Sequence, residues 1–234
     1  MRQKSLNKVV LSVGGSLIYT SEGINVPFLK NLSEFIHVQL KNNESVQYFL
    51  VIGGGGISRQ YMKASKEISS DLTNEDLDWL GIRAARLNAH LVHTILKDVA
   101  EKDIITNYSI IKKINNRVVI ASAWKPGWST DYCATLLCEM YGINTVINLS
   151  NIEQVYTSDP KIDKNAKPIS KISWRNFRRL VGDTWTPGLN VPFDPIASKK
   201  AQDMKLVTVV LSGNNFDNFS NYINGGEFLG TVIG

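Results

Sequence analysis

The sequence predicts an α/β protein in which helices cover both faces of a mainly parallel, doubly wound sheet. Short apolar segments rich in β-branched residues recur along the 234 residues, at 9–13, 48–52, 117–121, 145–149 and 206–211. Helix-like segments separate the earlier ones, and this alternation is typical of parallel sheets. Two of the strands also lead directly into glycine clusters, as strand-to-helix turns often do.

In the first half of the chain, each strand is followed by a turn and then by a helix. The two glycine clusters are Gly14-Gly15-Ser16, after strand 9–13, and Gly53-Gly54-Gly55-Gly56, after strand 48–52. We expect the helices of this half at 26–41, 58–68 and 75–97.

The second half continues the pattern with shorter helices. We expect them at 130–141, 173–181 and 195–204, the first of them capped by Ser129 or Thr130. Residues 216–223 are then expected to form a last helix and 230–233 an edge strand. Because the length suits one large α/β domain, residues 1–234 are interpreted as a single domain.

The glycine clusters at two strand ends indicate anion binding. Glycine lets the chain turn tightly and brings backbone N–H groups toward an anion at a helix N-terminus, where the helix dipole favours negative charge. The alternative is that glycine only closes a turn. A plain turn needs one or two glycines, so four in a row favour a cradle for phosphates.

Two further loops rich in turn residues follow strands, at 124–131 and 150–160. Ligands of open α/β sheets bind beyond the carboxyl ends of the strands. We therefore expect these two loops and the two glycine turns to gather at one edge of the sheet and to form the functional site.

Composition and charge limit the possible partners. With 43% hydrophobic and 20% charged residues, the chain is ordinary for a globular protein, and it has no apolar run of the roughly 18 to 20 residues that a membrane span needs. Residues 1–8 lack the apolar region of a signal peptide, so we expect a cytoplasmic protein without a membrane partner. The net charge of +5 favours anionic ligands. A loose basic run at 161–179 has no nucleic-acid motif beside it, so no nucleic-acid partner is expected.

The cysteines and histidines predict no metal site. Cys133 and Cys138 lie five residues apart in a helix-like segment, and we interpret them as buried free thiols. His90 and His93 could share one helix face as metal ligands. Without a cysteine or carboxylate at matching spacing, a surface or interface position is favoured.

Six motifs in order resemble those of the amino acid kinase superfamily, and most of all its uridylate kinases of the archaeal type. They are Val13-Gly14-Gly15-Ser16, Gly53-Gly54-Gly55 followed by Arg59, residues 78–82 with 86–89, and then 126–131, 150–160 and 194–199. Each motif alone is weak, whereas the order and the intervals of all six are specific. The resemblance covers almost the whole chain.

This resemblance implies a fold and a reaction. The fold is a single αβα sandwich around a mainly parallel sheet of about eight strands, assembled as a homo-hexamer, a trimer of dimers. The reaction is transfer of the γ-phosphoryl group of ATP to the 5′-phosphate of UMP, giving UDP in pyrimidine nucleotide biosynthesis. ATP and UMP are then the ligands, with Mg²⁺ bridging phosphate oxygens. Such a site must align two anions and neutralise their charge.

The resemblance also implies roles for residues near the phosphates. Arg59 would fork onto the acceptor phosphate, Lys199 would help to neutralise the donor phosphates, and Asp194 would position charged groups near them. Thr130 and its helix start would hold the acceptor phosphate. The residues of the glycine turns that would surround the phosphates are Gly14, Gly15, Ser16, Gly54 and Gly55.

For the nucleosides, the resemblance implies that Asp78 holds the acceptor ribose, because a carboxylate can accept two hydrogen bonds from a diol. Asn151, Tyr156 and Asp159 would contact the base and ribose of ATP. Other interpretations remain for three of these residues: Arg59 as a solvent-facing residue, Asp78 as an ordinary first-turn carboxylate, and Tyr156 as a core aromatic.

Two tryptophans flank the loop at 124–131, and their role has two interpretations. Trp124 and Trp128 either stack on a base or pack against a second subunit.

Three places depart from the family pattern. Ser12 stands where many relatives have a lysine, Ser122-Ala123 replaces Gly-Gly, and Glu153-Gln154 replaces Asp-Gly. If Gln154 needs a positive φ, it is strained, or else the loop has another shape. Two alternatives follow: a kinase of the same fold with another small phosphate or carboxylate acceptor, or a weakly catalytic nucleotide-binding relative. Lys8 or Lys125 could replace the missing lysine.

Overall fold

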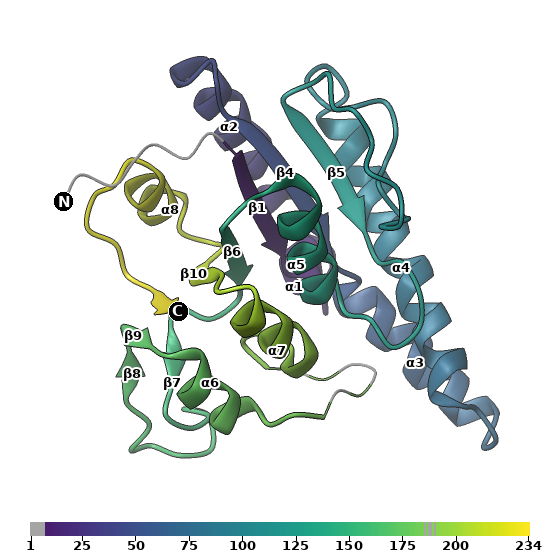
Figure 1. The fold of residues 1–234 in the computed structure, drawn as a ribbon. Helices are drawn as coiled ribbons and strands as arrows, with labels where there is room; N and C mark the ends of the chain where they lie inside the picture. Colours follow the sequence, from purple (N-terminus) through teal and green to yellow (C-terminus); the bar gives the residue numbers. More distant parts are fainter. Residues whose placement is uncertain (1–7, 185, 187–188, 190) are drawn as a thin grey trace.

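The computed structural model describes residues 8–184, 186, 189 and 191–234, and one large sheet runs through its centre (Figure 1). Within these residues, seven strands pair in the order β5-β4-β1-β6-β10-β11-β9. Neighbouring strands are parallel except β10 and β11, which are antiparallel. The strands are β1 (Lys8–Val13), β4 (Gln47–Ile52), β5 (Val118–Ser122), β6 (Thr145–Ser150), β9 (Lys171–Ile172), β10 (Val207–Ser212) and β11 (Thr231–Ile233).

The predicted α/β fold with a mainly parallel sheet is thus confirmed, with seven strands in place of about eight. The five predicted strand cores each lie within one residue of the observed strands. We predicted that residues 1–8 contain no signal peptide. Of these residues, only Lys8 lies within the described part of the chain.

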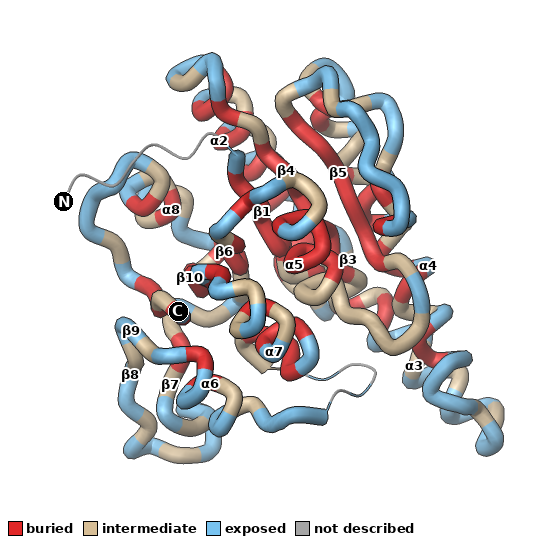
Figure 2. Tube along the Cα trace, in the orientation of Figure 1, coloured by how far each residue is buried: buried red, intermediate tan, exposed pale blue. Residues whose placement is uncertain are grey.

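The central strands are apolar on both faces, which explains their continuous hydrophobic sequences. In β1, Val9, Leu11 and Val13 belong to one buried cluster and Val10 to the other. Side chains of a strand alternate between faces, so a sheet covered on both sides needs apolar residues at every position. Figure 2 shows this core as buried strands between half-buried helices.

Helices form a layer on each face of the sheet (Figure 1). Apolar residues of α2, α4 and α8 pack on one face, and those of α5, α6 and α7 pack on the other. The helices are α1 (Gly15–Ile18), α2 (Val26–Asn42), α3 (Gly55–Ile68), α4 (Asn74–Ile95), α5 (Thr130–Tyr141), α6 (Trp174–Val181), α7 (Pro195–Asp203) and α8 (Phe216–Ile223). The predicted N-cap Ser129 is confirmed, because its side chain accepts a hydrogen bond from the backbone N–H of Tyr132.

The structure corrects one element and adds several short ones. Residues 230–233 were expected to form an edge strand, but β11 lies second from the edge because β9 pairs outside it. Helix α3 begins at Gly55, three residues before the predicted start. The added strands, β2 (Tyr19–Thr20), β3 (Gly23–Ile24), β7 (Val155–Tyr156), β8 (Pro168–Ile169) and the edge strand β9, have two residues each. Such segments are too short to show a hydrophobic period.

The cysteine prediction is confirmed, since Cys133 and Cys138 are both buried and free. Burial raises the pKa of the Cys133 thiol to about 12. In the part of the chain that the structure describes, no cluster of His, Cys, Asp and Glu could hold a metal ion, and no helix is long and apolar enough to cross a membrane. His93 instead contacts the backbone oxygen of Glu101 at 2.9 Å.

Candidate functional site

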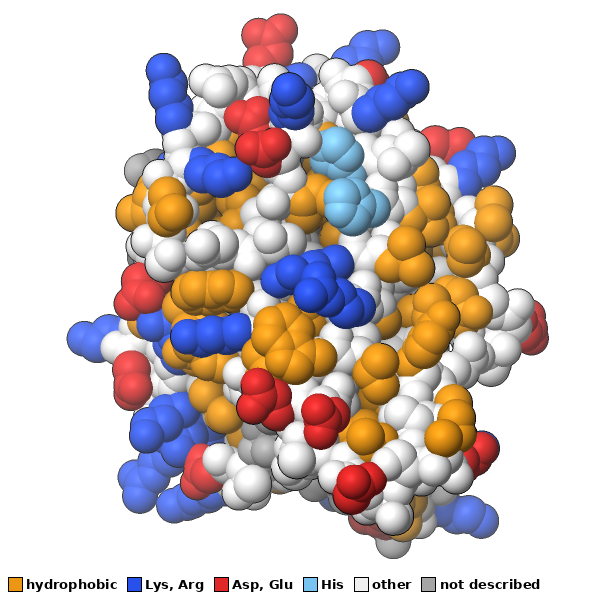
Figure 3. Space-filling view, turned by 90° about the vertical axis from the view of Figure 1, so that its right-hand side faces the viewer, with side chains coloured by type: hydrophobic (Ala, Val, Ile, Leu, Met, Phe, Trp, Pro, Cys, Tyr) orange, Lys and Arg blue, Asp and Glu red, His pale blue; other side chains and the backbone are white. Residues whose placement is uncertain are grey.

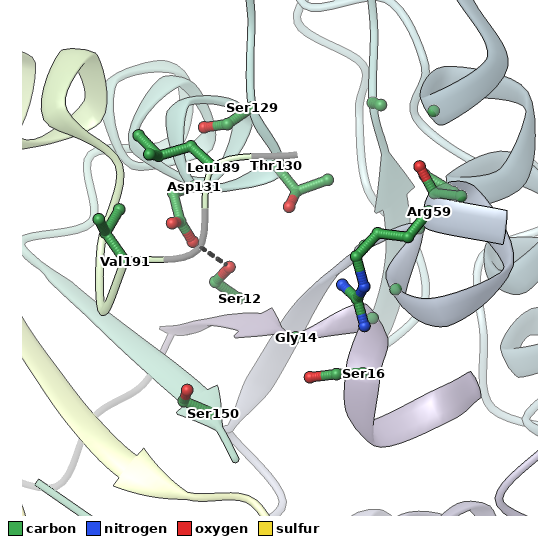
Figure 4. Close-up of a pocket in the computed structure, with 18 of the residues that line it drawn as sticks. Ser12, Gly14, Ser16, Arg59, Ser129, Thr130, Asp131, Ser150, Leu189 and Val191 are labelled. Atoms are coloured by element: carbon green, nitrogen blue, oxygen red, sulfur yellow. Dashed lines mark hydrogen bonds between the residues drawn. The ribbon is translucent and has the colours of Figure 1, made fainter. Parts of the chain in front are cut away.

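A polar pocket opens at the carboxyl ends of the parallel strands, and we call it the central pocket (Figure 4). Its walls come from the turns at 14–16 and 53–55, the loop at 123–131, Ser150 at the end of β6 and the following Asn151. Leu189 and Val191, from the segment before α7, complete it. The four loops that were predicted to meet at one sheet edge therefore do so.

The two glycine turns touch each other. The contact is so close that it is sufficient to require glycine at Gly15 and at Gly55. A Cβ atom at Gly15 would collide with the backbone N of Gly55 and would lie 2.6 Å from the carbonyl oxygen of Gly53. A Cβ atom at Gly55, whose φ is +63°, would collide with the carbonyl of Gly15. Both glycines are thus needed so that two strand-to-helix turns can lie backbone to backbone.

Three helices begin at the central pocket. Helices α1, α3 and α5 start at Gly15, Gly55 and Thr130, and all three residues line it. The N-caps of α1 and α3 are Gly14 and Gly54, which provide no side-chain hydrogen bond to the first turn. Helix N-termini present N–H groups and a partial positive charge, so this convergence favours anions.

Arg59 lies in the first two turns of α3 and is the one Lys or Arg among the described residues that line the central pocket. In Figure 4 its side chain runs from α3 toward the turn at Gly14 and Ser16. The side chain is exposed to solvent and also faces the pocket. Its guanidinium is therefore free to form a fork with an incoming phosphate.

Asn88 holds the second glycine turn in place, a role that the sequence motif around it did not reveal. Its buried side chain on α4 donates hydrogen bonds to the carbonyl oxygens of Gly53, at 2.9 Å, and Gly54, at 3.0 Å. A side-chain amide has two donor hydrogens, so one asparagine can satisfy both carbonyls.

We expect Asn88→Ala to lower the free energy of unfolding by about 1–3 kcal/mol, because it leaves two carbonyl groups without their donor. Chemical denaturation measures this change. Asn74→Ala, at an exposed position at the start of the same helix, is the matched control. Equal stability of the two variants would contradict the assigned role.

Two other side chains of α4 fix the loop at 123–131. Asp78 accepts a hydrogen bond from the backbone N–H of Gly127 at 2.7 Å, and burial raises the pKa of its carboxyl. Arg86 donates to the carbonyl oxygens of Ala123, at 3.1 Å, and Trp124, at 2.9 Å. Asp78 is therefore a pocket residue that also ties this loop to the helix.

The two tryptophans of this loop have different surroundings. Trp128 lines the central pocket, whereas Trp124 packs against Tyr108 at 5.8 Å between ring centroids. The rings of Trp124 and Trp128 meet edge to face, and the amine of Lys125 lies over both, at 4.7 and 4.2 Å from their centroids. Of the two, only Trp128 is in a position to contact a pocket ligand.

Ser12 occupies the position of the missing lysine and contacts a carboxyl group. Its hydroxyl donates to Oδ1 of Asp131 at 2.7 Å, the contact drawn as a dashed line in Figure 4. Lys8 and Lys125, the two lysines that were considered as substitutes, do not replace the missing lysine. Lys8 lies at the opposite end of β1 and contacts the carbonyl of Tyr141, and Lys125 is outside the residues that line the pocket.

A second pocket adjoins the central one along Ser150, Asn151, Val191 and Pro192, and we call it the adjoining pocket. Tyr156 and Asp159 line it, so the structure brings the three predicted ATP contacts together with Asn151 at the junction. Asp159 also stabilises its own loop by accepting a hydrogen bond from the N–H of Lys161.

The departure at Glu153-Gln154 causes no backbone strain. Among the described non-glycine residues, only Lys205 has a positive φ. The Gln154 side chain instead donates to the carbonyl oxygen of Gly230 at 3.1 Å, which ties the loop to β11. At the other departure, Ser122 donates to the carbonyl of Ile52, and Ala123 lines the central pocket.

Two predicted site residues lie outside both pockets. Lys199 is exposed on α7. Asp194 is buried and caps α7 by accepting a hydrogen bond from the N–H of Ala197 at 2.7 Å. The structure therefore does not bring the Lys199 side chain to the other candidates, whereas Asp194 contacts the pocket residue Asp131, which accepts a hydrogen bond from its backbone N–H.

The chain is similar to known proteins along nearly its whole length. Residues 7–212 match the model of the amino acid kinase family. A uridylate kinase of Archaeoglobus fulgidus is 34% identical over 97% of this chain and 99% of its own, and one of Methanocorpusculum labreanum is 32% identical over 98% and 96%. The crystal structure of the Archaeoglobus fulgidus uridylate kinase superposes with a TM-score of 0.80 at 30% identity and covers 97% of this chain and 100% of its own.

Proposed function

Because this chain belongs to the amino acid kinase family, we propose that it is a uridylate kinase, which transfers the γ-phosphoryl group of ATP to UMP and releases UDP and ADP. The observation that carries this conclusion is the similarity to archaeal uridylate kinases over nearly the full length of both chains. The central pocket suits the reaction, since phosphoryl transfer depends on positioning and charge neutralisation.

For the acceptor, we propose that UMP occupies the side of the central pocket formed by α3, α4 and the loop at 123–131. Arg59 and the start of α5 at Thr130 would contact its phosphate. Asp78 would accept a ribose hydroxyl on Oδ1, because Oδ2 is already bonded to the N–H of Gly127. Apolar Ile82, on α4, and Trp128 line the same side and suit an aromatic base.

For the donor, we propose that the nucleoside of ATP enters the adjoining pocket, with Asn151, Tyr156 and Asp159 as contacts. The triphosphate would then extend past Ser150 and Asn151, which both pockets share, toward Gly14 and Gly15. This direction brings the γ-phosphate to the three helix starts. The roles that were predicted for Lys199 and Asp194 toward the donor phosphates remain proposals that this arrangement does not require.

Mg²⁺ fits this site as part of the nucleotide complex. The described residues include no cluster of acidic, histidine or cysteine side chains that could hold a metal ion by itself. Mg²⁺ in kinases is commonly held by substrate phosphates, water and few protein carboxylates. We therefore propose that ATP phosphate oxygens supply most of its ligands and that Mg²⁺ neutralises part of their charge. ATP and UMP are cytoplasmic metabolites, so we propose the same location for the protein.

The proposal is tested by measuring ADP release from Mg-ATP with a panel of nucleoside monophosphates. We expect turnover with UMP well above that with CMP, AMP and GMP. Turnover with another monophosphate alone would show a same-fold kinase with a different acceptor. ATP binding without any turnover would show a weakly catalytic relative and would contradict the proposal.

We also propose that the protein is a homo-oligomer, a hexamer built as a trimer of dimers, and that α4 contributes a subunit contact. Figure 3 shows the face that carries α3 and α4, where hydrophobic side chains gather among basic ones. The exposed stripe on α4 runs along Trp79, Arg83 and Leu87, which are spaced four residues apart. Trp79 is 38% and Leu87 60% exposed, and apolar side chains that lie together on a surface often mark an interface.

Leu87→Asp is expected to lower the mass of the particle in solution, because a charge at an apolar contact must be desolvated on assembly. Light scattering coupled to size-exclusion chromatography measures the mass. Val38→Asp, at a 53% exposed position on α2, is the control for introducing the same charge elsewhere. An unchanged mass for Leu87→Asp would remove α4 from the proposed contact.

A further inference from the structure

One carboxyl group at the central pocket joins four elements of the fold. Asp131 lies in the first turn of α5, and its Oδ1 accepts hydrogen bonds from Ser12 of β1, at 2.7 Å, and from the amide of Asn148 of β6, at 3.2 Å. Its Oδ2 accepts from the backbone N–H of Asp194, just before α7, at 3.1 Å. The carboxyl group therefore holds together the ends of β1, β6, α5 and α7.

No cation faces this carboxyl group among the described residues. Its hydrogen-bond donors are neutral, and none of the described ion pairs includes Asp131. The ionisable groups that interact with its charge are the carboxyl of Asp194 and the thiol of Cys133, also on α5. Arg59 and Asp78 are the other charged residues that line the described part of the pocket.

An anionic phosphate in this pocket would therefore meet a half-buried carboxylate without a counter-charge. Like charges repel strongly where water is excluded, and the common result is that one of the groups takes up a proton. A lysine in place of Ser12, as in many relatives, would put a positive charge beside this carboxylate. Ser12 cannot do so, because a hydroxyl carries no charge.

A serine does allow the contact to survive a change of protonation. A hydroxyl can donate to a carboxylate and can rotate to accept from a carboxylic acid, whereas an ammonium group can only donate. The Ser12–Asp131 hydrogen bond can thus persist in both states, and the junction of β1, β6, α5 and α7 stays closed.

We propose that Asp131 is a positioning residue that takes up one proton from solvent when a substrate phosphate enters the central pocket. The carboxylate and the proton then form a neutral carboxylic acid, which keeps the four elements together without repelling the phosphate. Burial raises the pKa of Asp131 to about 7; the Ser12 hydrogen bond lowers it and the charge of Asp194 raises it further, so uptake is feasible near neutral pH. The inference rests on the proposed function, because it takes nucleotides as the ligands.

Isothermal titration calorimetry measures the uptake. UMP and Mg-ATP are titrated separately at pH 8, each in buffers with different ionisation enthalpies, so that the dependence of the heat on the buffer gives the number of protons bound. At this pH the substrate phosphates are ionised already, since their last pKa is about 6. A carboxyl with a pKa near 7 is then mostly ionised. We expect the wild type to take up close to one proton with at least one of the two ligands.

Two variants make the test specific. Asp131→Asn removes the titrating group, and Ser12→Lys supplies a permanent counter-charge, so both are expected to bind nucleotide with no proton uptake. Wild-type binding without uptake from either ligand, or uptake that persists in both variants, would overturn the inference. If the wild type binds neither UMP nor Mg-ATP, the proposed function itself fails, which is a different result. Ser12→Lys keeps the test valid if Asp131→Asn does not fold.

Discussion

Arg59→Ala is expected to lower kcat/KM for UMP by about 10²–10³-fold, the usual effect of removing one donor aimed at developing charge. Both substrates are anions, and Arg59 is the one cationic side chain of the described pocket lining. The helix starts remain in the variant, so residual activity is expected. What is lost is a guanidinium fork that can bind two phosphate oxygens at once.

Steady-state kinetics with varied UMP measures the effect, and two variants serve as comparisons. Arg59→Lys keeps the charge but not the fork, so we expect an intermediate loss. Lys66→Ala removes an exposed cation from the last turn of the same helix and is expected to behave like the wild type. If Arg59→Ala and Lys66→Ala have the same kcat/KM, Arg59 does not act on the phosphates.

The second large effect is expected for Gly55→Ala, which should lower the free energy of unfolding by more than about 4 kcal/mol. An added methyl group would collide with the backbone of Gly15, and neither turn can withdraw without leaving its strand. The left-handed φ of +63° adds about 1–2 kcal/mol for any residue with a Cβ atom. Losses above 4–5 kcal/mol are uncommon and are diagnostic of such steric conflicts.

Gly142→Ala separates the two contributions. Gly142 caps α5 at the same φ of +63°, but an added Cβ atom would meet no atom within 4 Å. Alanine at this position therefore introduces the conformational cost alone. Denaturant unfolding of both variants measures the difference, and equal losses would show that the two glycine turns do not constrain each other.

Much of the fold could be predicted from the sequence because its cause is local. Segments such as 48–52 are apolar at each position, and a strand covered on both faces needs that pattern. The order of the six motifs also gave the family. The number of strands in the sheet and the identity of its edge strand could not be predicted. The reason is that β9 has two residues and is held by its pairing with β11.

The site was predictable in its loops but not in its internal contacts. Gly15 and Gly55 lie 40 positions apart in the sequence, and nothing local indicates that their backbones touch. Asn88 and Asp131 belong to recognised motifs, yet their roles depend on hydrogen bonds to distant strands and turns. Lys199 illustrates the reverse case, since its motif is present while its side chain faces solvent.

Helix α4 also determines which walls of the pocket can move relative to each other. Asp78, Arg86 and Asn88 connect this single helix to two of the pocket's walls, the loop at 123–131 and the turn at 53–55. A helix of 22 residues is a stiff rod of about 33 Å, so these two walls are carried as one body and the gap between them keeps its width. The loop that begins at Asn151, after the end of β6, has none of these three ties. Exchange of nucleotides is thus expected to proceed by movement on that side, against a stationary frame.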